Sequence, residues 1–98
     1  MNDGAAYEGE FTVRHKLGLH ARPAGRFVAL ASRFQAEIEV ARAGELGECV
    51  NGRSVLSLLS LAAAFGTRLR VRGVGADAEQ AVVALGQVLE QPLEGDGG

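Results

Sequence analysis

The sequence lacks several features that define whole classes of protein. It contains no tryptophan, and its single cysteine, Cys49, excludes an internal disulfide. The longest apolar run, residues 55–65, is about half the length that a membrane span needs and is interrupted by two serines. The first residues have neither the basic nor the apolar stretch of a secretory signal peptide. We therefore expect a cytoplasmic protein with no membrane insertion.

Positive charge is also scarce. Ten Lys and Arg residues against twelve Asp and Glu residues give a formal net charge of −2, which argues against a general nucleic-acid binder. The 98 residues, 47% of them hydrophobic, suffice for one small globular domain. We expect a flexible segment at 1–7, a domain at 8–91 and a flexible tail at 92–98.

The spacing of apolar residues predicts seven elements in the order β-α-β-β-α-β-α. Alternation of polar and apolar residues predicts strands at 10–14, 37–40, 48–50 and 67–72. Helical spacing predicts helices at 21–34, at 55–64 and from Asp77 to just before Pro92, with Asp77 and Gln80 spaced as a capping box. Strands with one apolar and one polar edge imply an α+β fold, in which helices cover one face of an antiparallel sheet.

Residues 17–24, with the sequence Leu-Gly-Leu-His-Ala-Arg-Pro-Ala, carry the strongest chemical signal. Pro23 fits only in the first turn of a helix, so the helix begins within a residue or two of His20. N–H groups at a helix start have no intrahelical acceptor and favour anions. A neutral imidazole can attack phosphorus, and the guanidinium of Arg22 suits phosphate oxygens. The segment predicts that His20 is phosphorylated beside Ala21, Arg22 and Pro23. The alternative is a histidine that merely starts a helix.

Ser54 is the second candidate, because it precedes the apolar helix predicted at 55–64. Its spacing favours an N-cap, and a phosphate is also tolerated at a helix N-terminus. One side of this helix can face the core through Leu58, Leu61, Ala62 and Phe65. The other side leaves an exposed apolar patch typical of protein docking, unless the helix is simply buried; it consists of Val55, Leu56 and Leu59.

The remaining histidine and the cysteine show no pattern of their own. His15 lies at a strand end in phase with Phe11 and Val13, which favours a structural or surface role. With two histidines and one cysteine, the chain has no cluster at metal-ligand spacing, and Cys49 has no CxxC partner. We expect no metal site, no cofactor and no redox role for Cys49.

Two motifs resemble those of a known family. Residues 20–24, His-Ala-Arg-Pro-Ala, resemble the active-site signature of HPr, the histidine-containing phosphocarrier of the bacterial phosphoenolpyruvate-dependent sugar phosphotransferase system. Residues 53–61 resemble the family's second motif, which carries its regulatory serine. The turn at Gly66, the strand after it and the helix start at 75–77 match in order and spacing. The resemblance covers roughly residues 8–91 and implies an open-faced β-sandwich, with three helices on one side of four antiparallel strands.

The resemblance implies a phosphocarrier and not an enzyme. His20 would accept a phosphoryl group at Nδ1 from phospho-enzyme I and pass it to sugar-specific EIIA domains, with Arg22 helping to hold it. Ser54 matches the serine that an HPr kinase/phosphorylase modifies in carbon catabolite regulation. The family's docking surface matches Ala21, Arg22, Val55, Leu56 and Leu59, and we expect a monomer. The chain departs from the family at Leu17, a position that is usually polar, in a longer segment at 40–54, and in its two tails.

Two other functions remain open. The first is a regulatory HPr-like protein that acts in carbon or nitrogen control through Ser54 or His20, without sugar transport. The second is a small module that binds RNA or a metabolite through the row Arg68, Arg70 and Arg72. The scarcity of aromatic residues near the strands argues against RNA, because RNA-binding sheets stack bases on aromatic side chains.

Overall fold

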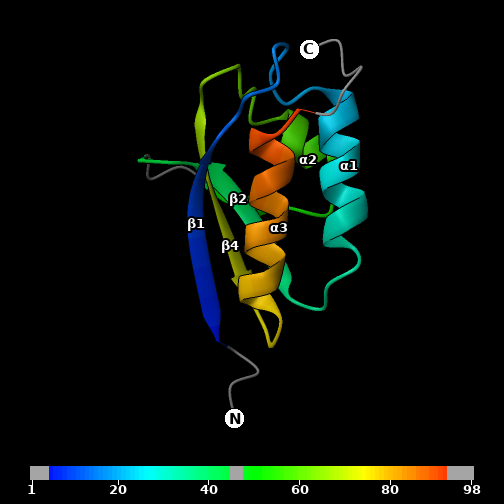
Figure 1. The fold of residues 1–98 in the computed structure, drawn as a ribbon, viewed down its shortest axis with the longest axis vertical. Coiled ribbons are helices and arrows are strands. Elements are labelled where there is room, and N and C mark those ends of the chain that lie inside the picture. Colours follow the sequence, from blue (N-terminus) through cyan, green and yellow to red (C-terminus); the bar gives the residue numbers. More distant parts are fainter. Residues whose placement is uncertain (1–4, 45–47, 93–98) are drawn as a thin grey trace.

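A computed structural model describes residues 5–44 and 48–92. One antiparallel sheet in the order β1-β4-β2-β3 is covered on one face by three helices, so the fold is the expected α+β open-faced sandwich (Figure 1). Its elements are β1 (Ala6–Thr12), α1 (Ala21–Ala31), β2 (Glu37–Arg42), β3 (Val50–Asn51), α2 (Val55–Leu59), β4 (Arg68–Val74) and α3 (Ala78–Glu90). Within the described ranges, every helix is too short or too polar to cross a membrane.

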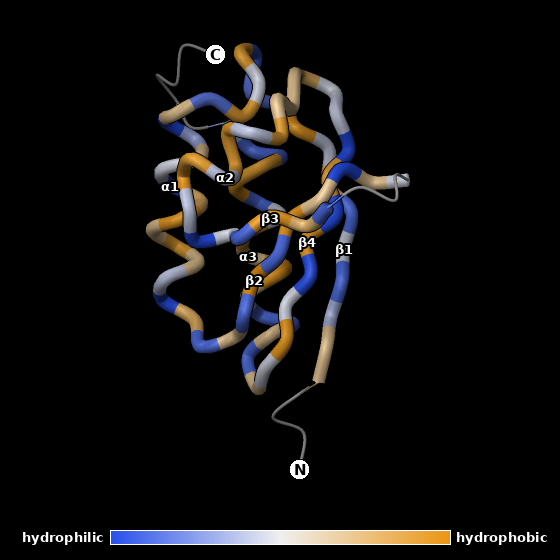
Figure 2. Tube along the Cα trace, turned by 180° about the vertical axis from the view of Figure 1, so that it is seen from behind, coloured by the Kyte–Doolittle hydropathy of each residue, from blue (hydrophilic) through white to orange (hydrophobic). Residues whose placement is uncertain are grey.

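The central strand β4 alternates between the two faces of the sheet. Leu69 and Val71 are fully buried under the helices, while Arg68, Arg70 and Arg72 point to the other face. Figure 2 shows this alternation of hydrophobic and hydrophilic residues from the side of the open face. The pattern confirms the prediction that one sheet face is covered and the other is exposed to water.

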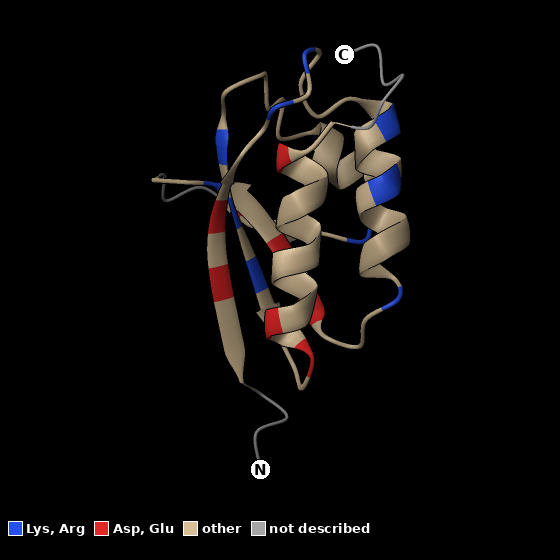
Figure 3. Ribbon diagram, viewed as in Figure 1, with Lys and Arg blue, Asp and Glu red and all other residues tan. Residues whose placement is uncertain are grey.

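Acidic residues flank the arginine row on the open face. Arg72 lies between Glu8 of β1 and Glu39 of β2, at N–O distances of 3.4 and 3.8 Å. Arg68 pairs with Glu10 at 3.1 Å, and Figure 3 shows the acidic bands of β1 beside the basic bands of β4. Such exposed pairs contribute less than about 1 kcal/mol each. Their main effect is to balance the charge of a face that would otherwise attract phosphates.

The core lies between the sheet and the helices. From α1, the predicted face supplies the fully buried Ala24, Phe27 and Ala31 and the partly buried Val28. The helix predicted at 21–34 ends earlier, at Ala31, so the partly buried Phe34 packs on the core from the loop that follows. The Phe11 ring lies between Gly9 and Gly86, where any side chain in place of the Gly86 hydrogen would collide with it. The missing side chain at Gly86 therefore lets α3 pack closely on β1.

Most predicted boundaries shift by a few residues, and the largest differences are in β1 and α2. β1 begins at Ala6 and not at residue 10, because Ala6 and Tyr7, assigned above to a flexible segment, pair with Val74 and Gly73 of β4. The helix predicted at 55–64 is wrong in length, since α2 ends at Leu59. Tighter turns follow it, and Ala62 adopts a left-handed φ of 51° that stops the helix.

The end of α2 also changes which residues face the core. Leu58 and Leu61 are buried as predicted. Ala62 and Phe65 are exposed, Phe65 to 58%, because the turn at Ala62 directs the chain away from the helix axis. The predicted core face of this helix is therefore half as long as expected.

The predicted capping role of Asp77 is wrong. Its side chain makes no cap hydrogen bond to α3. Its carboxylate instead accepts hydrogen bonds from the backbone N–H groups of Gln35 and Ala36, both at 2.9 Å. The Gln35 N–H is the main cause of a lowered pKa at Asp77. Asp77 thus ties the α1–β2 loop to the start of α3.

Candidate functional site

His20 is the N-cap residue of α1. Its backbone is extended, with φ −90° and ψ −169°, and its carbonyl accepts the Ala24 N–H at 3.0 Å to close the first helical turn. Its side chain makes no cap hydrogen bond. The buried Pro23 lies inside the first turn, as its missing N–H predicts. The prediction of a histidine at a helix start is confirmed.

One ring nitrogen of His20 is buried. The residue is half-buried, and its Nε2 atom is buried without a hydrogen-bond partner among the described residues. A group that approaches from outside therefore cannot reach Nε2. The family resemblance implies Nδ1 as the reactive nitrogen, but no local pattern in the sequence indicates that Nε2 is buried, because its burial depends on packing around the ring.

The loop before His20 is fixed to the loop before β4. Leu19 N–H donates to the carbonyl of Ala63 at 2.8 Å, and His20 N–H donates to the carbonyl of Gly18 at 2.9 Å. Gly18 has a φ of +79°, and a methyl group on it would lie 2.5 Å from the Ala63 oxygen. Glycine is therefore required at this position for two reasons. The backbone is left-handed, and the backbone of residue 63 leaves no room for a side chain.

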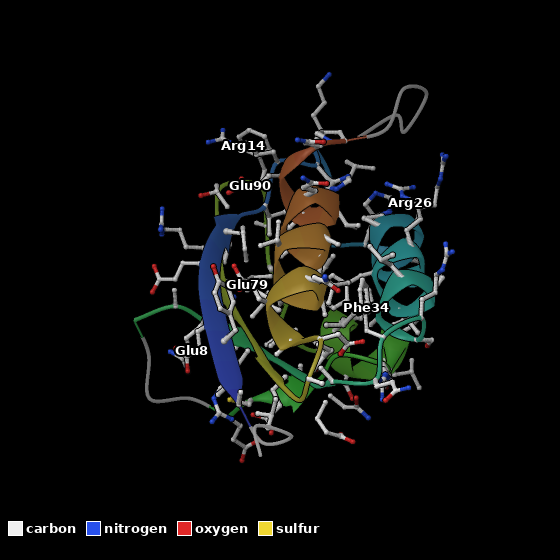
Figure 4. The ribbon with its side chains drawn as sticks, turned by 60° about the horizontal axis from the view of Figure 1, so that its bottom comes forward. Glu8, Arg14, Arg26, Phe34, Glu79 and Glu90 are labelled. Carbon is white, nitrogen blue, oxygen red and sulfur yellow. The ribbon has the colours of Figure 1, made fainter. Side chains whose placement is uncertain are left out.

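Ala21 and Arg22 are exposed at the start of α1, next to His20. Arg26 follows Arg22 by about one helical turn, and Figure 4 shows it on α1. The first turn of α1 contains no acidic residue. The positive charges of the two arginines and the positive end of the helix dipole thus all favour an anion at this end of α1.

Ser54 is the N-cap of α2, as its position predicted. Its hydroxyl oxygen accepts the Ser57 N–H at 3.1 Å. The neighbouring Arg53 donates from its guanidinium to the carbonyls of Phe34 and Ala36, at 2.6 and 2.8 Å, just beyond the C-terminal end of α1. Ser54 and His20 therefore lie toward opposite ends of α1, which is about 16 Å long.

Arg53 is a structural residue that the sequence analysis missed. Besides these two bonds, its Nε donates to the Ala31 carbonyl at 3.4 Å. The carbonyls at a helix C-terminus have no intrahelical partner, and a guanidinium there also complements the helix dipole. Arg53 thus joins the start of α2 to the end of α1. An arginine directly before an N-cap serine is the signal in the sequence, but its target is set by the fold.

The predicted apolar patch on α2 is only partly exposed. Leu56 is 80% exposed, whereas Val55 and Leu59 are half-buried and pack against the core. Leu17, in the loop before His20, is 69% exposed. Among the described residues, the most exposed large apolar side chains are Leu56, Leu17 and Phe65, and the exposure of the last two was not anticipated.

The other predicted residues are placed as follows. His15 is completely buried, which excludes the surface role and leaves the structural one of the two expected. Cys49 is exposed as a free thiol. Among residues 5–44 and 48–92, no group of three or more His, Cys, Asp or Glu side chains has the arrangement of a metal site.

Comparison with known proteins decides the family. The family model described as the PTS HPr component phosphorylation site, PTS-HPr, matches residues 7–91. The chain belongs to the PTS-HPr family. It is 39% identical to the phosphocarrier protein HPr of Pseudomonas aeruginosa, over 87% of this chain and 92% of the relative. A crystal structure of HPr from Bacillus anthracis, 36% identical, superposes with a TM-score of 0.79 over 88% of this chain and 99% of the other.

HPr domains also occur within longer relatives. The chain is 41% identical over 84 residues to the multiphosphoryl transfer protein of Escherichia coli O157:H7, a match that covers 86% of this chain. It spans 22% of the length of that relative. The likeness therefore concerns the HPr part alone and does not extend to the other activities of a longer protein.

Proposed function

We propose that this member of the PTS-HPr family carries a phosphoryl group on Nδ1 of His20. The observation that carries the proposal is the orientation of the ring, in which Nε2 is buried at the N-cap of α1. The lone pair of Nδ1 attacks the phosphorus of a phosphohistidine on enzyme I. An N–P bond forms on His20 as the donor's N–P bond breaks. The group then passes to an EIIA domain by the same exchange.

The start of α1 supplies the stabilisation of the carried group. Phosphoryl oxygens meet the N–H groups of the first helical turn, and the guanidinium of Arg22 adds charge-assisted hydrogen bonds. The dipole contributes about 0.3–1 kcal/mol and a hydrogen bond to a charged group about 1.5–3 kcal/mol. This modest stabilisation suits a group that must leave again.

The experiment that tests the proposal is labelling with phosphoenolpyruvate and enzyme I, followed by mass spectrometry of the modified residue. We expect a single label on His20, no label in His20→Ala, and slower labelling in Arg22→Ala. Arg33→Ala is the matched control, because it removes the same charge after the end of α1. Label that persists in His20→Ala would refute the proposal.

Leu56 anchors the docking surface for enzyme I and EIIA in this proposal. It is the most exposed large apolar side chain in the described part of the chain, and α2 packs against α1, which carries Ala21 and Arg22. We expect Leu56→Ser to raise the KM for this protein as a substrate of enzyme I. The kcat stays near its wild-type value, because the change removes an exposed side chain and none of the backbone hydrogen bonds at the start of α1.

Ser54 is proposed as a second phosphorylation site with a regulatory role. Its hydroxyl caps α2, and a phosphate there keeps favourable hydrogen bonds to the helix start. Because Ser54 lies toward the far end of α1, the added charge acts on docking beside Leu56 and not on His20 itself. Incubation with an HPr kinase and ATP, with mass spectrometry at Ser54, tests this role. An unmodified serine contradicts it.

A further inference from the structure

The last turn of α3 leaves one backbone carbonyl without its helical donor, and a side chain from another part of the chain replaces that donor. In a continuing helix, the carbonyl of Val88 accepts the N–H of the fourth residue after it. That residue is Pro92, which has no N–H. Gln91 N–H still donates to Gln87 at 2.8 Å, so Val88 is the next carbonyl that needs a donor. An unpaired buried carbonyl costs about 1–3 kcal/mol.

His15 supplies the missing donor. Its side chain is completely buried, and its Nε2 lies 2.7 Å from the Val88 oxygen. Because a carbonyl oxygen only accepts, the proton of this bond belongs to Nε2. The adjacent Arg14 N–H donates to Leu89 at 3.0 Å, and Thr12 N–H donates to the Glu90 carboxylate at 2.8 Å. Residues 12–15 thus cap the end of α3.

The same segment leads directly to the phosphorylation site. The backbone carbonyl of His15 accepts the N–H of Gly18 at 2.8 Å, which closes the turn two residues before His20. Figure 4 shows that Arg14 and Glu90 lie at the same end of the molecule, with Arg26 on the neighbouring helix. His15 therefore joins, in one residue, the end of α3 and the turn that presents His20.

We propose that His15 is a positioning residue for phosphoryl transfer, acting through the bond from its Nε2 to Val88. This inference deepens the proposed function and depends on it. With the bond in place, residues 15–20 are held between α3 on one side and residue 63 on the other. Without it, the bonds from Thr12 and Arg14 to the end of α3 remain. The turn that begins at His15 then loses its own side-chain bond to α3, and Nδ1 of His20 no longer stays aligned with an incoming phosphorus.

Two substitutions separate this role from packing. His15→Gln places an amide N–H near the position of Nε2 and keeps the donor, whereas His15→Met has a similar reach and no donor. We expect His15→Met to lower the kcat with phospho-enzyme I by about tenfold, since a displacement of about 1 Å can cost up to a hundredfold. The KM changes less than about twofold, because the docking surface is untouched. His15→Gln restores most of the kcat.

A second measurement needs no partner protein. Amide hydrogen exchange in ¹⁵N-labelled protein reports the protection of Gly18 and Leu19, with Val71 in the central strand as an internal reference. We expect faster exchange at Gly18 and Leu19 in His15→Met, and wild-type exchange in His15→Gln and at Val71. Equal kcat and equal exchange in both variants would overturn the inference. If the wild-type protein takes no label on His20, the proposed function fails instead, whatever the exchange rates show.

Discussion

The replacement Gly18→Ala tests how closely the loop of His20 is fitted to its neighbour. Gly18 has a φ of +79°, and the added methyl group would lie 2.5 Å from the Ala63 oxygen and 3.0 Å from the Ala64 Cα atom. The Ala63 oxygen is also the acceptor for Leu19 N–H. Backbone atoms cannot rotate away as a side chain does, so one loop must move away from the other.

The expected loss has two parts. A left-handed conformation costs an alanine about 1–2 kcal/mol, whatever surrounds it. Displacement of the Ala63 carbonyl breaks its bond with Leu19 N–H, which adds about 1–3 kcal/mol when a buried group is left unpaired. The sum is about 2–5 kcal/mol. A domain of this size has a free energy of unfolding of about 5–15 kcal/mol, so we expect the variant to fold with a clearly lower stability.

Gly66→Ala provides the matched control. Gly66 lies in the loop opposite, has a φ of +90°, and has nothing within 4 Å of the position of an added methyl group. Urea unfolding should be followed by circular dichroism, because the protein has no tryptophan to report by fluorescence. We expect Gly18→Ala to lose about 1–3 kcal/mol more than Gly66→Ala. Equal losses in the two variants would refute the argument that contact with residue 63 constrains the loop.

Three further predictions concern the rest of the fold. Ala62→Gly should raise the free energy of unfolding by about 1 kcal/mol in urea titrations, because glycine adopts the left-handed φ at no steric cost. Gly86→Ala should lower it by about 1–3 kcal/mol through overpacking against Phe11, and Phe11→Leu in the same chain should recover part of the loss in a double-mutant cycle. Asp77→Asn should destabilise at neutral pH. Because the folded pKa of Asp77 is lowered, mainly by the Gln35 N–H, its contribution is present above the ordinary aspartate pKa and is lost as pH falls below about 4. The difference between wild type and Asp77→Asn should therefore shrink in acid.

The sequence predicts an element correctly where the spacing of its own apolar residues decides which side chains are buried. The alternation through Leu69 and Val71 and the helical spacing from Ala24 to Ala31 survive in the structure, because both sets of residues face one core. Predictions failed where a contact between distant segments competes with the local pattern. Asp77 has the spacing of a cap, but two N–H groups of the α1–β2 loop take its carboxylate.

Some features of the candidate site could likewise be predicted from local sequence, and others could not. Its position could be predicted, because Pro23 fits only in the first turn of a helix and His20 is indeed the N-cap of α1. The orientation of the His20 ring could not, since it depends on packing that no local pattern encodes. The support from His15 was hidden for the same reason. Pro92 shows in the sequence that a carbonyl lacks its donor, but the donor lies 73 positions away from Val88 along the chain.

In the proposed function, alignment of His20 for transfer and recognition of partner proteins depend on different residues. The start of α1 and Arg22 hold the phosphoryl group in this proposal, and transfer needs these contacts to be weak enough for release. The alignment of His20 with an incoming phosphorus must then come from the loop that presents it. This loop is hydrogen-bonded to α3 on one side and to residue 63 on the other. Partner recognition depends on different residues, of which Leu56 is the most exposed. We therefore expect substitutions in the supports of the loop to change kcat and substitutions on the exposed face to change KM.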